Sequence, residues 1–195
     1  RKFKSENDID YQPSEITVSS GCKQLLFNAL MATLNRGDEV IIPAPYWVSY
    51  SAMVEIADGR PIIIPCAAEQ QFKLTPDKLE SAVTSATRWL ILNTPSNPTG
   101  AVYTRPELLA LAEVLLEHPE ILVITDDIYE HLIYGNVEFT TLAQVEPRLK
   151  ERTLTCNGMS KAYCMTGWRI GFAGGPETLI RAMAKLQTQS SFHPA

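Results

Sequence analysis

The chain has 195 residues, of which 45% are hydrophobic and 20% charged, a composition typical of a soluble globular domain with a sizeable core. Its 17 basic and 22 acidic residues give a formal net charge of −5. This balance, without any basic run, argues against nucleic acid or an anionic membrane surface as a partner. The longest apolar runs have the length of strands, so we expect no membrane-spanning segment.

The four cysteines, Cys22, Cys66, Cys156 and Cys164, lie in apolar segments and form no CxxC pair. We interpret them as reduced thiols and expect neither a disulfide framework nor a metal site. No secretory signal pattern opens the chain, and its first residues, RKFKSENDIDY, read like the interior of a longer protein. We therefore expect a cytoplasmic protein.

Short β-branched runs alternate along the chain with helical apolar patterns. In chain order we expect a strand at 15–20, a helix at 21–34, a strand at 39–44, a helix at 47–57, a strand at 60–66, a helix at 75–85, a strand at 88–94, a helix at 104–118, strands at 121–127, 152–158 and 168–175, and a helix at 176–189. Pro follows Thr75 at one helix start, and Thr104 forms a capping-box pattern with Glu107 at another.

Several of these strands are apolar without alternation, which is typical of strands buried on both faces of a parallel sheet. The sequence thus predicts one α/β domain with three layers, in which a mainly parallel seven-stranded sheet carries helices on both faces. Ligands of such sheets bind beyond the carboxyl ends of the strands, so polar residues at these ends are the site candidates.

After the first strand, Gly21, Cys22 and Lys23 begin a helix, whose free N–H groups and dipole favour a phosphate. A plain strand–helix turn explains this segment, taken alone, at least as well. After the second strand, Trp47 is able to stack on a flat ring, although core or interface aromatics are commoner. After the fourth, the loop NTPSNPTG fixes Asn97 between Ser96 and Pro98, either toward a ligand or within an ordinary turn.

The fifth strand runs into TDDIYEHLIY, so at least one of Asp126 and Asp127 should be poorly solvated and need a partner. Tyr129 is able to bring a hydroxyl to the same site, and a helix-capping role stays open for Asp127. In CNGMSKAYCMTGWRIGF, residues 156–172, apolar or small flanks surround Lys161 at the ligand edge, although most lysines simply lie at the surface. A desolvated amine beside a cation is a nucleophile that forms Schiff bases. Arg169, eight residues later, supplies that cation and a fork suited to phosphate.

A phosphate turn, a stacking aromatic, a fixed amide, a buried carboxylate, a phenol, a Schiff-base lysine and a phosphate-binding arginine are what pyridoxal 5′-phosphate (PLP) requires. In this hypothesis Asp126 pairs with the pyridinium nitrogen and keeps it protonated. Asn97 and Tyr129 hydrogen-bond the phenolic oxygen, while Lys161 holds the cofactor aldehyde and later moves protons.

Taken in order, NTPSNPTG, TDDIYEHL and NGMSKAYCMTGWRIGF resemble the fold-type-I class I/II aminotransferases. With SSGCKQ and PYWVSY they are most similar to the bacterial aspartate aminotransferase branch, and the resemblance covers essentially all 195 residues. It implies that the catalytic residues are Lys161, Asp126 and Tyr129. It further implies a set of cofactor-binding residues: Gly21, Cys22, Lys23, Trp47, Asn97, Asp126, Tyr129, Ser160, Lys161 and Arg169. Trp47 and Asn97 would also line the substrate pocket.

Two positions depart from the family pattern. Many relatives carry a phosphate-binding serine three residues before the lysine, where this chain has Gly158, so Ser160 or Lys23 must compensate, or nothing does. Cys22 stands where a smaller or hydroxylated residue is common, although a backbone N–H contact tolerates the change. The family's chains are also longer. We therefore interpret 1–195 as the PLP-binding large domain of a homodimeric enzyme whose N-terminal arm and C-terminal small domain lie outside this chain.

The resemblance implies ping-pong transfer of an amino group from an L-amino acid, with aspartate first and 2-oxoglutarate as acceptor. An aromatic, alanine or prephenate aminotransferase stays open within the same class. The isolated chain is expected to be inactive, because the arginine that grips the substrate α-carboxylate belongs to the small domain. A PLP-sensing domain of a transcription regulator is an alternative. A nucleotide-binding domain is another, but the chain has neither GxGxxG nor GxxxxGK[ST].

Overall fold

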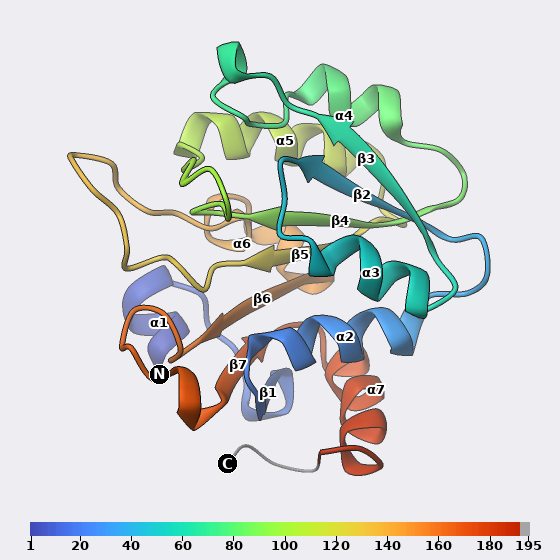
Figure 1. The fold of residues 1–195 in the computed structure, drawn as a ribbon, viewed down its shortest axis with the longest axis vertical. Coiled ribbons are helices and arrows are strands. Elements are labelled where there is room, and N and C mark those ends of the chain that lie inside the picture. The colour runs from blue at the N-terminus through green and yellow to red at the C-terminus, as the bar shows by residue number, and fades with distance from the viewer. Residues whose placement is uncertain (192–195) are drawn as a thin grey trace.

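The computed structural model describes residues 1–191, and its strands form one seven-stranded sheet in the order β1-β7-β6-β5-β4-β2-β3 (Figure 1). The strands are β1 (Ile16–Ser20), β2 (Glu39–Ala44), β3 (Arg60–Pro65), β4 (Thr87–Asn93), β5 (Leu122–Asp126), β6 (Thr153–Gly158) and β7 (Ile170–Gly174). All seven predicted strands are confirmed, with ends that differ by one or two residues. The start of the last one moves furthest, because Thr166–Trp168 forms a short 3-10 helix.

The sheet is mainly parallel, as predicted. Strands β3, β2, β4, β5 and β6 pair in parallel, whereas β7 runs antiparallel to both of its neighbours, β6 and β1. A short connection without a crossover helix joins β6 to β7, which suits an antiparallel pair. As a result, β7 begins at the edge where the parallel strands end.

Helices cover both faces of the sheet and complete the three predicted layers. On one face lie α2 (Cys22–Thr33), α3 (Ser49–Ile56) and α7 (Glu177–Thr188), and on the other α4 (Pro76–Ala82), α5 (Arg105–Glu117) and α6 (Leu142–Val145). The α5 capping box of Thr104 and Glu107 is confirmed. Thr75 precedes α4 without a side-chain cap. The structure adds α6 and α1 (Lys2–Asn7), which the sequence pattern did not predict.

The core lies on both sides of the central strands. Along β4, Trp89 and Ile91 pack toward α2 and α3, whereas Leu90 and Leu92 pack toward α4 and α5. These side chains are almost fully buried, and each contributes roughly 1.5–3 kcal/mol of transfer free energy. Burial on both faces explains why the strand is apolar without alternation. Within the described part of the chain, no helix combines the length and the apolar character that crossing a bilayer requires.

Candidate active site

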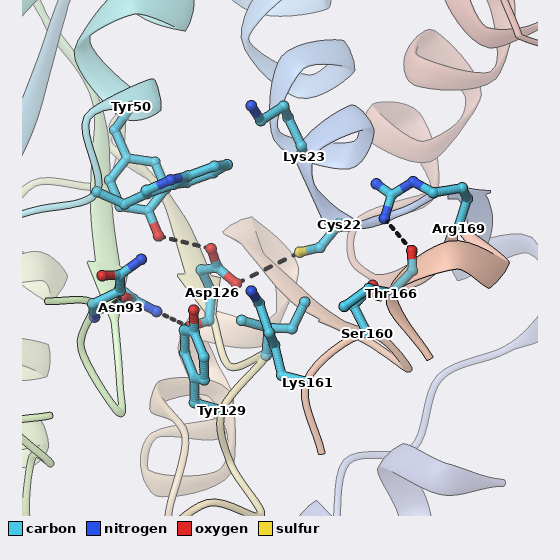
Figure 2. Close-up of a pocket in the computed structure, with 13 residues that line it drawn as sticks. Cys22, Lys23, Tyr50, Asn93, Asp126, Tyr129, Ser160, Lys161, Thr166 and Arg169 are labelled. Atoms are coloured by element: carbon cyan, nitrogen blue, oxygen red, sulfur yellow. Dashed lines mark hydrogen bonds between the residues drawn. The ribbon is translucent and has the colours of Figure 1, made fainter. Parts of the chain in front are cut away.

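A cleft of about 310 Å³ opens at the carboxyl edge of the sheet, beside the first turn of α2 (Figure 2). Its lining comes from segments spread over most of the chain: Cys22, Lys23, Trp47, Tyr50, Asn93, Asn97, Asp126, Ile128, Tyr129, Ser160, Lys161, Thr166 and Arg169. Every predicted site residue is in this lining except Gly21, whose chain neighbour Cys22 is. The parallel strands therefore bring together residues that are far apart in the sequence.

Asp126 ends β5 at the base of the cleft and is only 4% exposed. One carboxylate oxygen accepts a hydrogen bond of 2.7 Å from the Tyr50 hydroxyl, and the other accepts one of 3.5 Å from the Cys22 thiol (Figure 2). Burial raises the pKa of Asp126, although these hydrogen bonds and the charge of Lys161 oppose the shift. Because both side-chain donors are uncharged, the carboxylate is oriented but not neutralised.

Asp127 takes no part in the cleft. It is 1% exposed, and among the described residues neither of its carboxylate oxygens has a hydrogen bond. Burial raises the pKa of Asp127 well above its usual value, and the nearby Thr141 hydroxyl, which does not reach hydrogen-bond geometry, opposes this shift only in part. The possible helix-capping role is wrong, because a turn and not a helix follows at 128–131. Of the two aspartates, only Asp126 is presented to a ligand.

Lys161 and Tyr129 face each other across one side of the cleft. The Lys161 Nζ lies 5.7 Å from the centre of the Tyr129 ring, and both side chains point toward Asp126 in Figure 2. The predicted desolvation of Lys161 is wrong in this structure: its side chain is exposed. The lysine lies on the turn after β6, at the open rim of the cleft. Its neighbours Gly158 and Ser160 are the residues that do reach the protein interior.

The other end of the cleft brings a cationic side chain to the start of α2. Gly21 has φ +85, and a Cβ at this position would lie 2.1 Å from Nη2 of Arg169, so the missing side chain makes room for the guanidinium. Arg169 donates to the Thr166 carbonyl at 2.9 Å and to the Ser20 carbonyl at 3.4 Å. With the free N–H groups that begin α2, this cation favours a phosphate.

Two further polar side chains lie near this end. Lys23 places its Nζ 4.7 Å from the centre of the Trp47 ring, and Ser160 lines the cleft while only 7% exposed. A side chain at position 158 has no room, since a Cβ on Gly158 would lie 2.8 Å from the Ile170 carbonyl oxygen. The backbone packing in this chain therefore leaves no room at position 158 for the serine that many relatives of the resembled family carry. Ser160 and Lys23 both remain available in the cleft.

Sequence reasoning missed several lining residues, of which Tyr50 and Asn93 hydrogen-bond to Asp126. Asn93 donates to the Asp126 backbone carbonyl at 2.6 Å and accepts from the Asn97 backbone N–H at 2.7 Å, so it ties the 93–100 loop to the end of β5. Its place at the end of a strand was the available signal. For Tyr50 the signal was weaker, because an aromatic in a helical pattern usually belongs to the core. Ile128 and Thr166 were also missed.

Comparison with known proteins gives a consistent result. A family model described as "Aminotransferase class I and II" matches residues 1–195. The chain is 60% identical over 193 residues to an aspartate/prephenate aminotransferase of Cereibacter sphaeroides, covering 99% of this chain and 48% of that protein. It is 56% identical over 194 residues to an aspartate aminotransferase of Rhizobium meliloti, covering 100% of this chain and 47% of that protein.

Solved structures show the same similarity. A crystal structure of the Rhizobium meliloti aspartate aminotransferase superposes with a TM-score of 0.98 at 56% identity, over 100% of this chain and 48% of that one. An aromatic aminotransferase from Pyrococcus horikoshii gives a TM-score of 0.95 at 42% identity, over 99% and 51%. The chain thus spans about half the length of these relatives. By its sequence and by its fold, the chain belongs to the class I and II aminotransferases.

Proposed function

We propose that residues 1–195 are the PLP-binding large domain of a longer aminotransferase. The family membership supports the reaction class, and the cleft supports the cofactor. Asp126 carries the most weight, because it is a buried carboxylate at the base of the cleft whose side-chain hydrogen-bond donors are all uncharged. Such a group is complementary to a cation, and the protonated ring nitrogen of PLP is one.

The rest of the cleft fits the same cofactor. PLP needs a primary amine near its aldehyde, donors for its phenolic oxygen and a cationic end for its phosphate. Lys161, Tyr129 and Arg169 line the cleft, and they have the chemistry that these three roles require. When bound, the cofactor supplies an electron sink that stabilises negative charge at the substrate Cα.

The chain's own residues bind, orient and move protons. Asp126 would keep the ring nitrogen protonated, while Tyr129 and Asn97 would donate hydrogen bonds to the phenolic oxygen. Lys161 would hold the cofactor at its aldehyde, and its amine, when free, would serve as the base that moves a proton at the substrate Cα. The remaining cofactor-binding residues would orient the group by stacking (Trp47) and by holding the phosphate (Gly21, Cys22, Lys23, Ser160 and Arg169). Trp47 and Asn97 would also contact the substrate.

Aspartate is the amino donor we propose, with 2-oxoglutarate as the acceptor in a ping-pong reaction. The name of the Cereibacter sphaeroides relative, aspartate/prephenate aminotransferase, supports prephenate as a second acceptor. The resemblance to the Pyrococcus horikoshii enzyme keeps an aromatic substrate as the alternative. We further propose a cytoplasmic homodimer. A regulator that binds PLP without turnover is the competing function.

Covalent labelling tests the proposal directly. The full-length protein should show the visible absorbance of PLP bound to a lysine, and borohydride should link the cofactor permanently to Lys161. Peptide mapping identifies the labelled lysine, and Lys23 is the internal comparison because it lines the same cleft. Label on Lys23 or elsewhere would contradict the assignment. Turnover assays with aspartate and either 2-oxoglutarate or prephenate then separate the acceptors, and bound PLP without any turnover would favour the regulator.

A further inference from the structure

A second polar cluster lies beside the cleft, where α1 packs against the turn that follows β5 (Figure 1). We call it the Glu130 network; it consists of Lys2, Glu6, Asn7, Glu130 and His131. Glu130 is 6% exposed and forms an ion pair with Lys2. Its carboxylate also accepts a hydrogen bond of 3.1 Å from the Asn7 amide and lies 3.2 Å from Nε2 of His131. Asn7 in turn accepts a hydrogen bond of 2.7 Å from Lys2.

Three members of the network resemble a metal-binding group. One ligand atom each from Glu6, Glu130 and His131 lies within 4.8 Å of the others. The Lys2 ammonium, however, already supplies the positive charge, because it pairs with Glu130 and lies 3.7 Å from Glu6. A divalent ion would have to displace it against charge repulsion. The network is therefore a linkage between segments and not a metal site.

The network connects α1 to the two loops that carry Tyr129 and Lys161. Tyr129 directly precedes Glu130. The His131 ring packs edge-on against the ring of Tyr163, two residues after Lys161, with 5.9 Å between ring centres. On its other side α1 is fixed by apolar packing, since its buried Phe3 belongs to a small hydrophobic cluster with Ile9, Ala143 and Phe172. The loop that carries Tyr129 is therefore held directly by α1, and the loop that carries Lys161 contacts it through the His131 ring.

We propose that Glu130 is a positioning residue that holds the Tyr129 hydroxyl in place to donate to the phenolic oxygen of bound PLP. This inference rests on the proposed function. The turn has two backbone hydrogen bonds of its own, from the Glu130 N–H to Asp127 at 2.9 Å and from the Leu132 N–H to Tyr129 at 2.8 Å. These bonds shape the turn from within. Ile128, directly before Tyr129, packs into the main hydrophobic core and holds one side of the turn. On the other side of Tyr129, the buried Glu130 carboxylate attaches the turn to α1.

The proposal predicts the sign of a spectroscopic shift. A hydrogen bond from Tyr129 stabilises the deprotonated phenolic oxygen, so misplacing Tyr129 raises the pH at which the visible band of the bound cofactor titrates. Removing the negative charge of Glu130, acting through space alone, favours the deprotonated form and lowers that pH. Positioning and direct electrostatics therefore give opposite signs for Glu130→Gln.

The test uses the full-length protein loaded with PLP and without substrate. We expect Tyr129→Phe to raise the titration midpoint by about 1 pH unit and Glu130→Gln to raise it by about half as much. In the Tyr129→Phe background, Glu130→Gln should cause no further rise, because both changes remove the same hydrogen bond. Asn7→Leu removes the hydrogen bonds of Asn7 with Glu130 and Lys2 without changing any charge, and it should also raise the midpoint.

Glu39 provides a matched control. It is 3% exposed and ion-paired with Arg60, but it begins β2 at the amino edge of the sheet, away from the cleft. Glu39→Gln should lower the thermal unfolding midpoint as Glu130→Gln does, and it should leave the cofactor band unchanged. A band that responds to Glu130→Gln but not to Glu39→Gln separates positioning from general destabilisation.

Two outcomes would overturn the proposal. If Tyr129→Phe raises the midpoint while Glu130→Gln and Asn7→Leu leave it unchanged or lower it, Glu130 is only structural and the proposed cofactor site stands. If Tyr129→Phe itself has no effect while PLP still binds, the role of Tyr129 in the proposed function is wrong, and the positioning role falls with it.

Discussion

The Asp126 carboxylate receives one side-chain hydrogen bond on each oxygen, from Tyr50 and from Cys22. These donors fix its direction, and burial still raises its pKa because neither donor carries a charge. In such a low-dielectric position, a cation within the cleft interacts far more strongly than it would in water. The cofactor's ring nitrogen, in the proposed function, is that cation.

Asp126→Ala in the full-length protein should therefore separate binding from chemistry. PLP stays attached through Lys161 and the phosphate contacts, but the ring nitrogen loses its partner and no longer stays protonated. We expect the rate of the half-reaction with aspartate to fall roughly 10²-fold or more, as expected for a buried charge-assisted contact. Single-turnover absorbance measures this rate. A near-normal rate would assign the role elsewhere.

Asp127 predicts a pH dependence of stability. Its folded pKa is raised, so the acid form is favoured in the folded protein. The stability that this group contributes is full below the unfolded pKa of about 3.8 and is lost as the pH rises toward the folded pKa. Asp127→Asn removes this loss, so the variant should gain in free energy of unfolding over the wild type as the pH rises.

Urea unfolding between about pH 4 and pH 8 measures that difference, which should grow with pH across this window. Asp10→Asn is a suitable control, because Asp10 is exposed. A constant difference at all pH values would show that Asp127 stays ionised in the folded protein.

For single residues, the sequence predicts which residue types come together at the site. It predicts much less of which side chains form hydrogen bonds with one another. Asp126 could be assigned because it ends a recognisable strand, and Arg169 because it follows Lys161 by eight residues. The Tyr50 partnership could not, since 76 residues separate the two side chains and only the packing of α3 brings the hydroxyl to the carboxylate. The prediction that Lys161 is desolvated was wrong for a related reason. Small neighbouring residues indicate a tight turn, but they do not indicate how deeply the next residue is buried.

Among the elements, the junction of β1, α2 and β7 has the tightest backbone packing at the site. A Cβ on Gly171 would lie 2.4 Å from the Gly21 carbonyl carbon and 2.5 Å from the Cys22 nitrogen. The start of α2 is thus pressed against β7, and this contact fixes its N–H groups relative to Arg169. Glycine is required on both sides of the contact, at Gly21 for conformation and at Gly171 for space.

Gly21→Ala should therefore weaken cofactor binding more than it weakens the fold. The added methyl group displaces the Arg169 guanidinium, and loss of a charge-assisted phosphate contact corresponds to roughly a 10- to 100-fold rise in the PLP dissociation constant. Positive φ costs the variant about 1–3 kcal/mol of stability as well. Equilibrium titration of the apoprotein with PLP measures the binding.

Gly37→Ala is the matched control for that variant. Gly37 has a similar φ of +92, and a Cβ there would have nothing within 4 Å. It should lose comparable stability and bind PLP normally. Equal binding losses in both variants would show that backbone strain, and not the displaced arginine, causes the effect.

The elements that the sequence predicted are the long or doubly buried ones. Several strands are continuous apolar runs, and α5 has a capping box at its start. By contrast, α1 has six residues and α6 four, which is too short for a helical period to emerge. The direction of β7 could also not be predicted from the sequence, because the composition of a strand does not show whether it runs antiparallel within a mainly parallel sheet.

For the whole molecule, the proposed cofactor site is complete within residues 1–195, whereas the proposed substrate site is not. In the proposed function all contacts to the cofactor come from residues within 1–195, whereas the carboxylate-binding arginine that the family resemblance implies is proposed to lie outside this chain. The cleft is also open to water, which weakens its electrostatic contacts. A polypeptide limited to these residues should bind PLP weakly and show negligible transamination.

The assay compares purified residues 1–195 with the full-length protein under the same conditions. PLP is added, and oxaloacetate formation from aspartate and 2-oxoglutarate is followed. Circular dichroism confirms that the shorter chain is folded before its activity is judged. Turnover comparable to that of the full-length protein would show that the missing arginine is dispensable and would contradict the proposed substrate binding.

The antiparallel pairing of β1 with β7 also bears on the order of folding during synthesis. Strand β1 leaves the ribosome before the other strands of the sheet. Its neighbour in the sheet is β7, the last strand to leave, and the pairing places Ile16 opposite Gly174. Loops of this length close late, whereas β6 and β7 meet across a short connection. Gly21 and Arg169 therefore come together only when the sheet is completed. The phosphate end of the cleft would be the last part to form, so acquisition of PLP would report that the whole sheet has closed.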